Sequence, residues 1–221
     1  MHPAPPQAPP RRAPRITLLV AAVLGLAALA YAGRGPLLMS APACLSGRWN
    51  GCVDTVNGVV FLTLLALPLA GLVVWALARW RVARGVPGAW RTSVAEVGMV
   101  HGTVPFVWMI LTPGSGAGVV PGRLSLVPFA DLATMGALGI AGNLLAFAAL
   151  GAFAPVRFAA LASVARVAAL GAACSVLVET AQFAFQLDRV SSVDDVLLNA
   201  TGAALAALAT RRWWRTAGVP G

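Results

Sequence analysis

The residue in this sequence with the clearest chemical potential is a glutamate inside an apolar run. Glu179 lies within residues 163–186, most of which are apolar. A carboxylate in such a run costs several kcal/mol unless it is protonated, paired or hydrated. Gln182 and Gln186 follow at the helical spacing i, i+3 and i+7, which places all three side chains on one face. We therefore predict a polar stripe that faces protein or water.

A second polar face follows in the next apolar run. Asp195, Asn199 and Gly202 are spaced i, i+4 and i+7, and Gly202 would let a neighbouring backbone come close. The connecting segment, Leu-Asp-Arg-Val-Ser-Ser, is short enough to make the two helices antiparallel neighbours. Its arginine, Arg189, is expected to reach one of the carboxylates. We predict that the two polar faces meet.

Asp194 and Asp195 have a structural explanation as well as a functional one. Ser192 is a good N-cap for the last helix, and acidic residues in the first turn suit the helix dipole. Capping therefore stays open as at least part of the role of the two aspartates.

These residues must be positioned by membrane-spanning helices. Hydrophobic residues make up 59% of the chain and charged residues 10%, which excludes an ordinary soluble protein. About 20 apolar residues cross a bilayer. We predict an all-α, polytopic transmembrane helical bundle of about six helices. The expected spans, of which the first is taken as an uncleaved helix and not a signal peptide, are 16–32, 57–78, 93–111, 136–154, 163–186 and 196–210.

The arginines predict the orientation of this bundle. All sixteen basic residues are arginine, and in a six-span protein the basic segments 11–15, 79–91, 157–166 and 211–215 fall on one face. The positive-inside rule then makes both termini cytoplasmic, so that residues 1–15 form a disordered Pro/Arg-rich tail and residues 212–221 a cytoplasmic C-terminal tail. The net charge of +9 is explained by the lipid bilayer, and no nucleic-acid partner is expected.

Two cysteines lie in the first outward loop of this topology. Cys44 and Cys52 would face an oxidising compartment, and a disulfide and two unpaired thiols both remain open. No histidine lies near them, and neither a metal nor another cofactor is expected.

Glycines predict where helices come close. Small residues let helices approach one another in lipid. The expected contact points are Gly98, Gly102, Gly136, Gly139 and Gly142.

Residues 123–208 resemble the VanZ-like family of bacterial membrane proteins, named for a member associated with resistance to the glycopeptide antibiotic teicoplanin. The family's pattern of Glu, Gln, Arg, an Asp pair, Asn and Gly is matched by Glu179, Gln182, Arg189, Asp194, Asp195, Asn199 and Gly202. An earlier family segment resembles Asn143, Leu144, Leu145, Phe147, Leu150 and Gly151.

The match departs from the family pattern at three positions. Ser125 stands where the family often has Asn, Ala149 where it has Pro, and Ser192 where it has a further Asp. The missing acid weakens any metal site that needs three carboxylates. The resemblance implies a VanZ-like region at 112–211, preceded by an appended set of three helices at 16–111.

We expect the candidate polar site to face outward in a multi-pass protein of the bacterial plasma membrane. Its residues are Arg123, Asn143, Glu179, Gln182, Arg189, Asp194, Asp195 and Asn199. The resemblance favours a cell-envelope factor linked to glycopeptide antibiotic susceptibility, with a lipid-linked envelope precursor or a glycopeptide as partner.

Two other classes of function remain open. One is a small-solute or proton-coupled transporter, in which the acids and amides line a path. The other is a membrane enzyme acting on lipid-linked cell-wall precursors, with Glu179 as general acid or base and Arg123 and Arg189 binding phosphate. The enzyme comes last because the sequence offers no nucleophile-base pair and no metal set.

Overall fold

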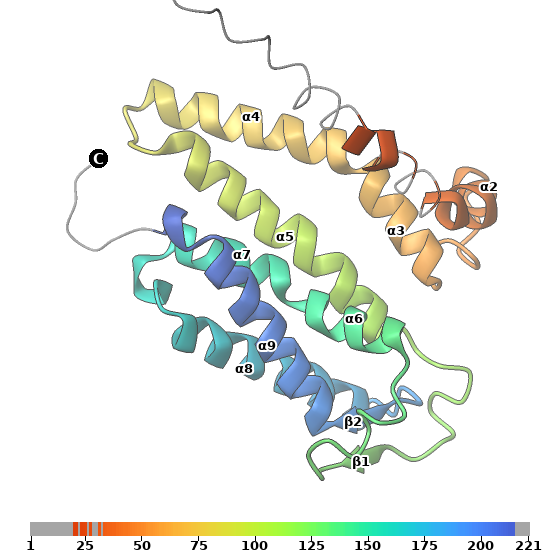
Figure 1. Ribbon diagram of the computed structural model, residues 1–221. Helices are drawn as coiled ribbons and strands as arrows, with labels where there is room; N and C mark the ends of the chain where they lie inside the picture. The colour runs from red at the N-terminus through yellow and green to blue at the C-terminus, as the bar shows by residue number, and fades with distance from the viewer. Residues whose placement is uncertain (1–19, 22, 26, 28–30, 32, 215–221) are drawn as a thin grey trace, which may run out of the picture. The chain divides into compact units, whose positions relative to one another are not determined.

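The computed structural model describes residues 20, 21, 23–25, 27, 31 and 33–214, and they are mostly helical (Figure 1). The chain divides into two units, Met1–Phe61 and Leu62–Gly221, each taken by itself below. The predicted tail at 1–15, most of the predicted span at 16–32 and the tail beyond residue 214 lie outside the described residues. The elements in chain order are η1 (Pro36–Ser40), α2 (Ala41–Leu45), α3 (Val56–Leu65), α4 (Leu67–Ala83), α5 (Ala89–Leu111), β1 (Arg123–Ser125), α6 (Ala137–Ala146), α7 (Ala148–Arg157), η2 (Ala159–Leu161), α8 (Val164–Ala184), β2 (Val190–Ser192), α9 (Val193–Ala209) and η3 (Arg211–Trp213).

In the first unit, a disulfide and a contact between two hydroxyl groups link residues that are apart in the sequence. The sulfur atoms of Cys44 and Cys52 are joined in a disulfide, which is one of the two states that the sequence left open. The hydroxyl oxygens of Ser40 and Thr55 lie 3.4 Å apart.

A bend separates α3 from α4. The two helices differ in direction by 41°, and Pro68 lies in the first turn of α4. A proline lacks the amide hydrogen and its ring collides with the carbonyl of the preceding turn, which breaks a continuous helix. The chain then turns back into α5 through Gly85 and Gly88, both with positive φ.

The core of the second unit lies among α5, α6, α7, α8 and α9. α8 packs against α9, and α7 packs against both α5 and α9 (Figure 1). The contact of α8 with α9 confirms the pairing predicted from their short connection. The buried centre consists of Ala146, Phe147, Val167, Val178, Ala203 and Ala207.

Glycines set the closest approaches in this core. A Cβ on Gly98 would lie 2.6 Å from Phe153 Cε2, and one on Gly102 would meet a side chain of α7 at 2.4 Å. A Cβ on Gly202 would lie 1.8 Å from the carbonyl oxygen of Leu144. The predicted contact roles of Gly98, Gly102 and Gly202 are thus confirmed.

Three other glycines do not mark helix contacts. A Cβ on Gly136 or Gly142 would meet nothing within 4 Å, and one on Gly139 would meet only Met135, four residues earlier. Gly136 is extended at the N-terminus of α6, and no atom of another helix lies within 4 Å of a Cβ built at these three positions. The predicted contacts at this end of α6 are therefore wrong.

Two short strands depart from the predicted all-α fold. β1 and β2 pair in parallel, with Leu124 opposite Ser191 and Ser125 opposite Ser192. Each strand has three residues, too few to give a clear sequence pattern. The second unit is therefore a helical bundle with a small parallel sheet at one end.

The helices are those of a membrane protein. Ala89–Leu111, Ala137–Arg157 and Val164–Ala184 are each long and apolar enough to cross a bilayer, and the bent pair of α3 and α4 could add a fourth crossing. α9, which covers residues 196–209 of the expected span at 196–210, has 17 residues. The six-span arrangement and the cytoplasmic termini stay predictions.

We expect Gly202→Ala to destabilise the second unit, because its Cβ would collide with the backbone of α6. The free energy of unfolding should fall by about 2 kcal/mol or more. Gly142→Ala is the matched control, since open space surrounds that position and alanine favours a helix. Thermal unfolding of the purified proteins in detergent is the measurement, and equal midpoints for the two variants would contradict the packing described.

Candidate functional site

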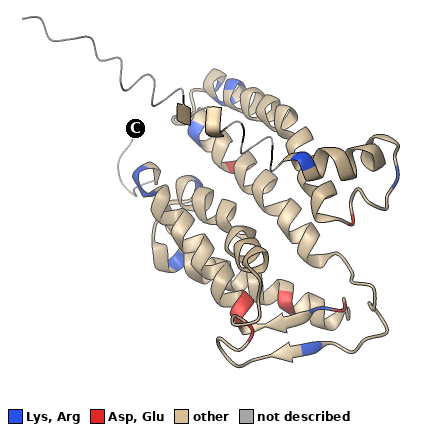
Figure 2. Cartoon of the chain, turned by 45° about the vertical axis from the view of Figure 1, so that its right-hand side comes forward, with Lys and Arg blue, Asp and Glu red and all other residues tan. Residues whose placement is uncertain are grey.

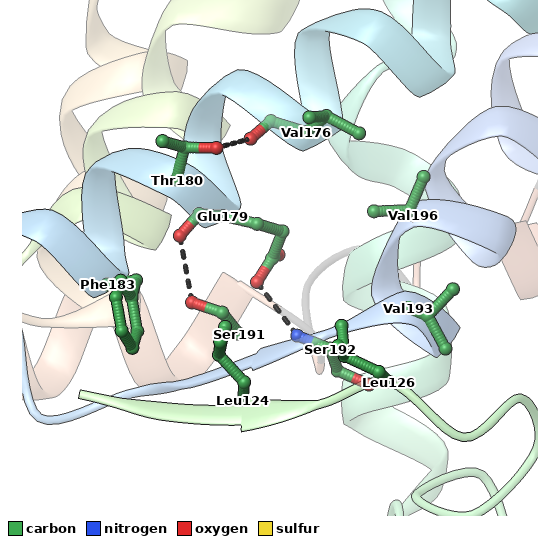
Figure 3. Close-up of a pocket in the computed structure, with 10 residues that line it drawn as sticks. All are labelled: Leu124, Leu126, Val176, Glu179, Thr180, Phe183, Ser191, Ser192, Val193 and Val196. Carbon is green, nitrogen blue, oxygen red and sulfur yellow. Dashed lines mark hydrogen bonds between the residues drawn. The ribbon is translucent and has the colours of Figure 1, made fainter.

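Glu179 is the buried carboxylate around which the site forms. It lies on α8 and is 9% exposed. Its Oε2 accepts a hydrogen bond from the backbone N–H of Ser192 at 3.0 Å, and its backbone carbonyl accepts one from the Ser191 hydroxyl at 2.8 Å. Figure 3 shows both bonds joining α8 to β2. The carboxylate is thus partnered by the backbone of a strand.

Asp194 is enclosed by the loop that follows β1. One carboxylate oxygen accepts the N–H of Phe129, and the other accepts those of Asp131 at 2.9 Å and Leu132 at 3.1 Å. The side chain is 2% exposed, and three backbone donors satisfy much of its capacity as an acceptor. Asp194 therefore fixes the loop to the start of α9.

Ser192 links the cap of α9 to a second acid. Its hydroxyl oxygen accepts the N–H of Asp194 at 3.1 Å, which confirms the predicted N-cap. The same hydroxyl donates to Asp131 Oδ2 at 2.6 Å. The hydroxyls of Ser125 and Ser192 lower the pKa of Asp131 below its usual value. Sequence reasoning did not assign Asp131 to the site, because 61 positions separate it from Ser192.

Two asparagines connect the polar faces of neighbouring helices. Asn143 on α6 donates to Asp195 Oδ1 at 2.7 Å. Asn199 on α9 donates to the Ser175 hydroxyl on α8 at 2.7 Å. Ser175 lies one turn before Glu179 on the same helix, so polar groups of α8 and α9 meet inside the bundle. Nothing in the spacing analysis pointed to Ser175, which a 3.6-residue period would have placed on the Glu179 face.

The predicted stripe on α8 is shorter than expected. Gln182 is buried and its amide nitrogen donates to the backbone carbonyl of Ile110 at 3.0 Å. Gln186 is exposed and has a positive φ beyond the end of α8 at Ala184. The prediction that Gln186 continues the stripe is wrong, because the helix ends before it.

The two candidate arginines, Arg123 and Arg189, contact groups other than the carboxylates of the predicted site. The guanidinium of Arg123 is 3.7 Å from a carboxylate oxygen of Asp188, and that of Arg189 donates to the carbonyl of Thr112 at 3.3 Å. Both arginines are exposed. The expectation that Arg189 reaches Glu179 or the Asp194-Asp195 pair is not met, since its bond leads to the loop after α5.

A cavity of about 310 Å³ lies beside Glu179. It lies between α8 and the two strands, with the first turn of α9 at its side (Figure 3). Its lining residues are Leu124, Leu126, Val176, Glu179, Thr180, Phe183, Ser191, Ser192, Val193 and Val196. Small-molecule sites typically measure roughly 300–1,000 Å³ and have mostly apolar walls with a few polar groups, a description that fits this cavity.

Charge is unevenly distributed within the second unit. Figure 2 shows most acidic residues of this unit near the small sheet, which also carries Arg123 in β1, and most basic residues near the opposite ends of the helices, where Glu96 lies among them. Within the described ranges, no group of three His, Cys, Asp or Glu side chains is placed to hold a metal ion. The site therefore offers acceptor oxygens and buried amides.

A second ionic cluster, which sequence reasoning missed, joins three helices away from the sheet. The Glu96 carboxylate on α5 is bonded to Arg81 on α4 and to Arg157 on α7. Arg81 also donates to the Ser93 hydroxyl at 2.8 Å. A helical spacing signal existed for Ser93 and Glu96, at i and i+3, but the two arginines come from other helices.

The comparisons with known proteins identify the family. A family model for VanZ/LLP1 matches residues 103–214, which include the small sheet, α6 to α9 and every residue of the predicted site. The chain belongs to this family. No match is found among the curated proteins or among the solved structures.

We expect Asp194→Asn to lower the free energy of unfolding by about 2 kcal/mol. The amide nitrogen of asparagine would face backbone N–H groups and leave at least one buried donor unpaired. Asp188→Asn is the control, because that side chain accepts a single backbone N–H, from Gly116, which an amide oxygen can still receive. Chemical unfolding in detergent would measure both variants. A loss no larger than that of the control would show that the loop anchor is unimportant.

Glu96→Gln should destabilise the contact of α4 and α7 with α5. Two guanidinium groups would then lie near one another without a counter-charge, at a cost of about 1–3 kcal/mol after allowance for partial exposure. Introducing Arg157→Gln into the same protein should recover part of the loss, since it removes one of the two charges. Thermal unfolding of the single and double variants tests this, and additive losses would argue against the ionic cluster.

Proposed function

We propose that this protein is a multi-pass cell-envelope factor of the bacterial plasma membrane, linked to glycopeptide antibiotic susceptibility. It uses an outward-facing site at Glu179 to bind a component of the envelope. Residues 16–111 supply the N-terminal helices, and residues 112–211 form the VanZ-like region that holds the site. In this arrangement six spans leave the tails at 1–15 and 212–221 in the cytoplasm.

The observation that carries this proposal is the cavity beside a buried carboxylate. Glu179 is kept in an apolar helix by the amide of Ser192, and its side chain forms part of a cavity wall. Burying an ionisable group is costly, and within a membrane such residues mark functional sites. The chain belongs to the VanZ/LLP1 family, and the resemblance of its residues to the VanZ-like pattern suggests the link with glycopeptide susceptibility.

The geometry gives less support to an enzyme acting on lipid-linked precursors. That hypothesis needs Arg123 and Arg189 to bind phosphate beside Glu179. Arg123 instead lies against Asp188, and Arg189 is bonded to the Thr112 carbonyl. The acids near Glu179 would also repel a phosphate group.

A transporter remains the second candidate because of two buried oxygens. Gln182 Oε1 and Asn199 Oδ1 are buried without a hydrogen-bond partner, and internal water could bridge such acceptors. Proteoliposomes that contain a pH-sensitive dye would test this hypothesis. Proton flux above that of empty vesicles, and lost in Glu179→Gln, would replace the envelope-factor proposal.

Glu179→Ala should reduce the protein's effect on glycopeptide susceptibility to that of an empty vector. The variant removes the acceptor for Ser192 and the carboxylate in the cavity wall, but it should still insert, since alanine is a good helix former. The measurement is the inhibitory concentration of teicoplanin for a bacterial host that expresses each variant, with membrane abundance determined in parallel. Asp54→Asn, in the other unit, is the charge-matched control. Full activity of Glu179→Ala at normal abundance would remove Glu179 from the proposed site.

The outward orientation makes a separate prediction about labelling. Ser115 and Gly85 are exposed at opposite ends of α5, in the loops after and before it. In a Cys174→Ala background, Ser115→Cys should react with a membrane-impermeant maleimide on intact cells, whereas Gly85→Cys should react only after lysis. The reverse pattern would place the Glu179 site at the cytoplasmic surface.

A further inference from the structure

The hydroxyl groups in the wall of the cavity beside Glu179 form hydrogen bonds with other groups of the protein. The Thr180 hydroxyl donates to the Val176 carbonyl at 2.7 Å, and the Ser191 hydroxyl donates to the Glu179 carbonyl. The Ser192 hydroxyl donates to Asp131 and accepts the backbone N–H of Asp194. The remaining wall is apolar and consists of Leu124, Leu126, Val176, Phe183, Val193 and Val196. Such a wall favours a hydrocarbon chain over a sugar or a peptide.

Several apolar residues that line the cavity are also exposed at the surface of the second unit. Val176 is 50% exposed and Phe183 40% exposed, and Leu126 on the other side of the cavity is 72% exposed. Val176 and Phe183 belong to Val164–Ala184, a helix apolar enough to cross a bilayer. Exposed apolar side chains on such a helix face acyl chains. A ligand can therefore enter sideways from the membrane.

The charges around Glu179 restrict the head group of such a ligand. The charge of the Asp195 carboxylate acts on Glu179, and the Asp131 carboxylate accepts the hydroxyl of Ser192, whose backbone amide donates to Glu179. Arg123 and Arg189, the nearest candidate cations, contact Asp188 and Thr112 instead. Glu179 Oε2 accepts the Ser192 amide at 3.0 Å, and the Ser191 hydroxyl lies close to the same carboxyl group. A carboxylate has about four acceptor positions, so these two donors leave capacity for a bond from a ligand.

We propose that this cavity binds one hydrocarbon chain of a membrane amphiphile, whose head group donates hydrogen bonds to Glu179 and carries no negative charge. Hydroxyl and ammonium heads share this chemistry, and the experiment below distinguishes them. The inference rests on the site of the proposed function and adds the class of ligand. It excludes an anionic head, such as a fatty-acid carboxylate, from the position next to Glu179.

Photolabelling can test the head-group preference directly. The full-length protein, in phosphatidylcholine vesicles at about pH 9, where carboxylates are ionised and an amine is still protonated, would be irradiated with three diazirine probes of equal chain length that end in an amine, an alcohol or a carboxylic acid. Peptide mass spectrometry would locate the adducts. We expect adducts on α8 and the start of α9, with the acid probe labelling roughly tenfold less than the better of the other two. Comparison of the amine with the alcohol shows whether a positive charge adds to binding.

Variants make this test specific to the cavity. Glu179→Gln keeps an acceptor for Ser192 but removes the charge, so the acid probe should label it nearly as well as the alcohol does. Asp54→Asn should retain the wild-type preference. Val196→Trp, which fills the cavity, should abolish the labelling of α8, and competition by an unlabelled long-chain alcohol gives the same information if that variant fails to fold.

Two results would overturn the proposal. One is equal labelling by the acid and alcohol probes in the wild-type protein, and the other is labelling that neither Val196→Trp nor the competitor reduces. Failure of the proposed function would be seen separately, as unchanged teicoplanin susceptibility in Glu179→Ala. If Glu179→Ala loses its effect on teicoplanin susceptibility but the three probes show no head-group preference, the site is retained and this class of ligand is rejected.

Discussion

A carboxylate inside an apolar helix needs a donor, and this protein supplies one from the backbone of a strand. The amide of Ser192 reaches Glu179 because β2 lies across the end of α8, and β2 is paired with β1. The loop after β1 is held in turn because three of its backbone amides donate to the Asp194 carboxylate. The strands, the loop and the cap of α9 thus form a single arrangement around two buried acids.

The same bundle holds a second ionic group at a distance from the first. Glu96 and Ile110 lie near opposite ends of α5, about 21 Å apart along the helix axis at 1.5 Å per residue. Ile110 accepts the Gln182 amide near the polar site, whereas Glu96 binds Arg81 and Arg157. The family match begins at residue 103, so the Glu96 cluster joins α4, which precedes the match, and the first part of α5 to α7, which lies within it.

Sequence periodicity could predict what lies on one helix or on two consecutive ones. It predicted the pairing of α8 with α9, the cap at Ser192 and the close approach at Gly202, because each depends on local spacing. It could not predict that the partners of Asp194 come from a loop more than sixty positions earlier, since loop geometry has no period. Gln186 and Arg189 were misjudged for a related reason, because the end of α8 reverses the chain and directs both side chains elsewhere.

The pairing of β1 and β2 has a consequence for how the chain would cross a membrane. Two paired strands lie at the same end of the bundle, so the chain between them has to come back to the end from which it left. Ala137–Arg157 and Val164–Ala184 are both long and apolar enough to cross a bilayer. If each of these two helices crosses it once, the chain makes one outward and one return passage between β1 and β2. The hydrogen bonds between the three-residue strands would then keep both loops in one aqueous compartment, whichever way the whole protein is inserted.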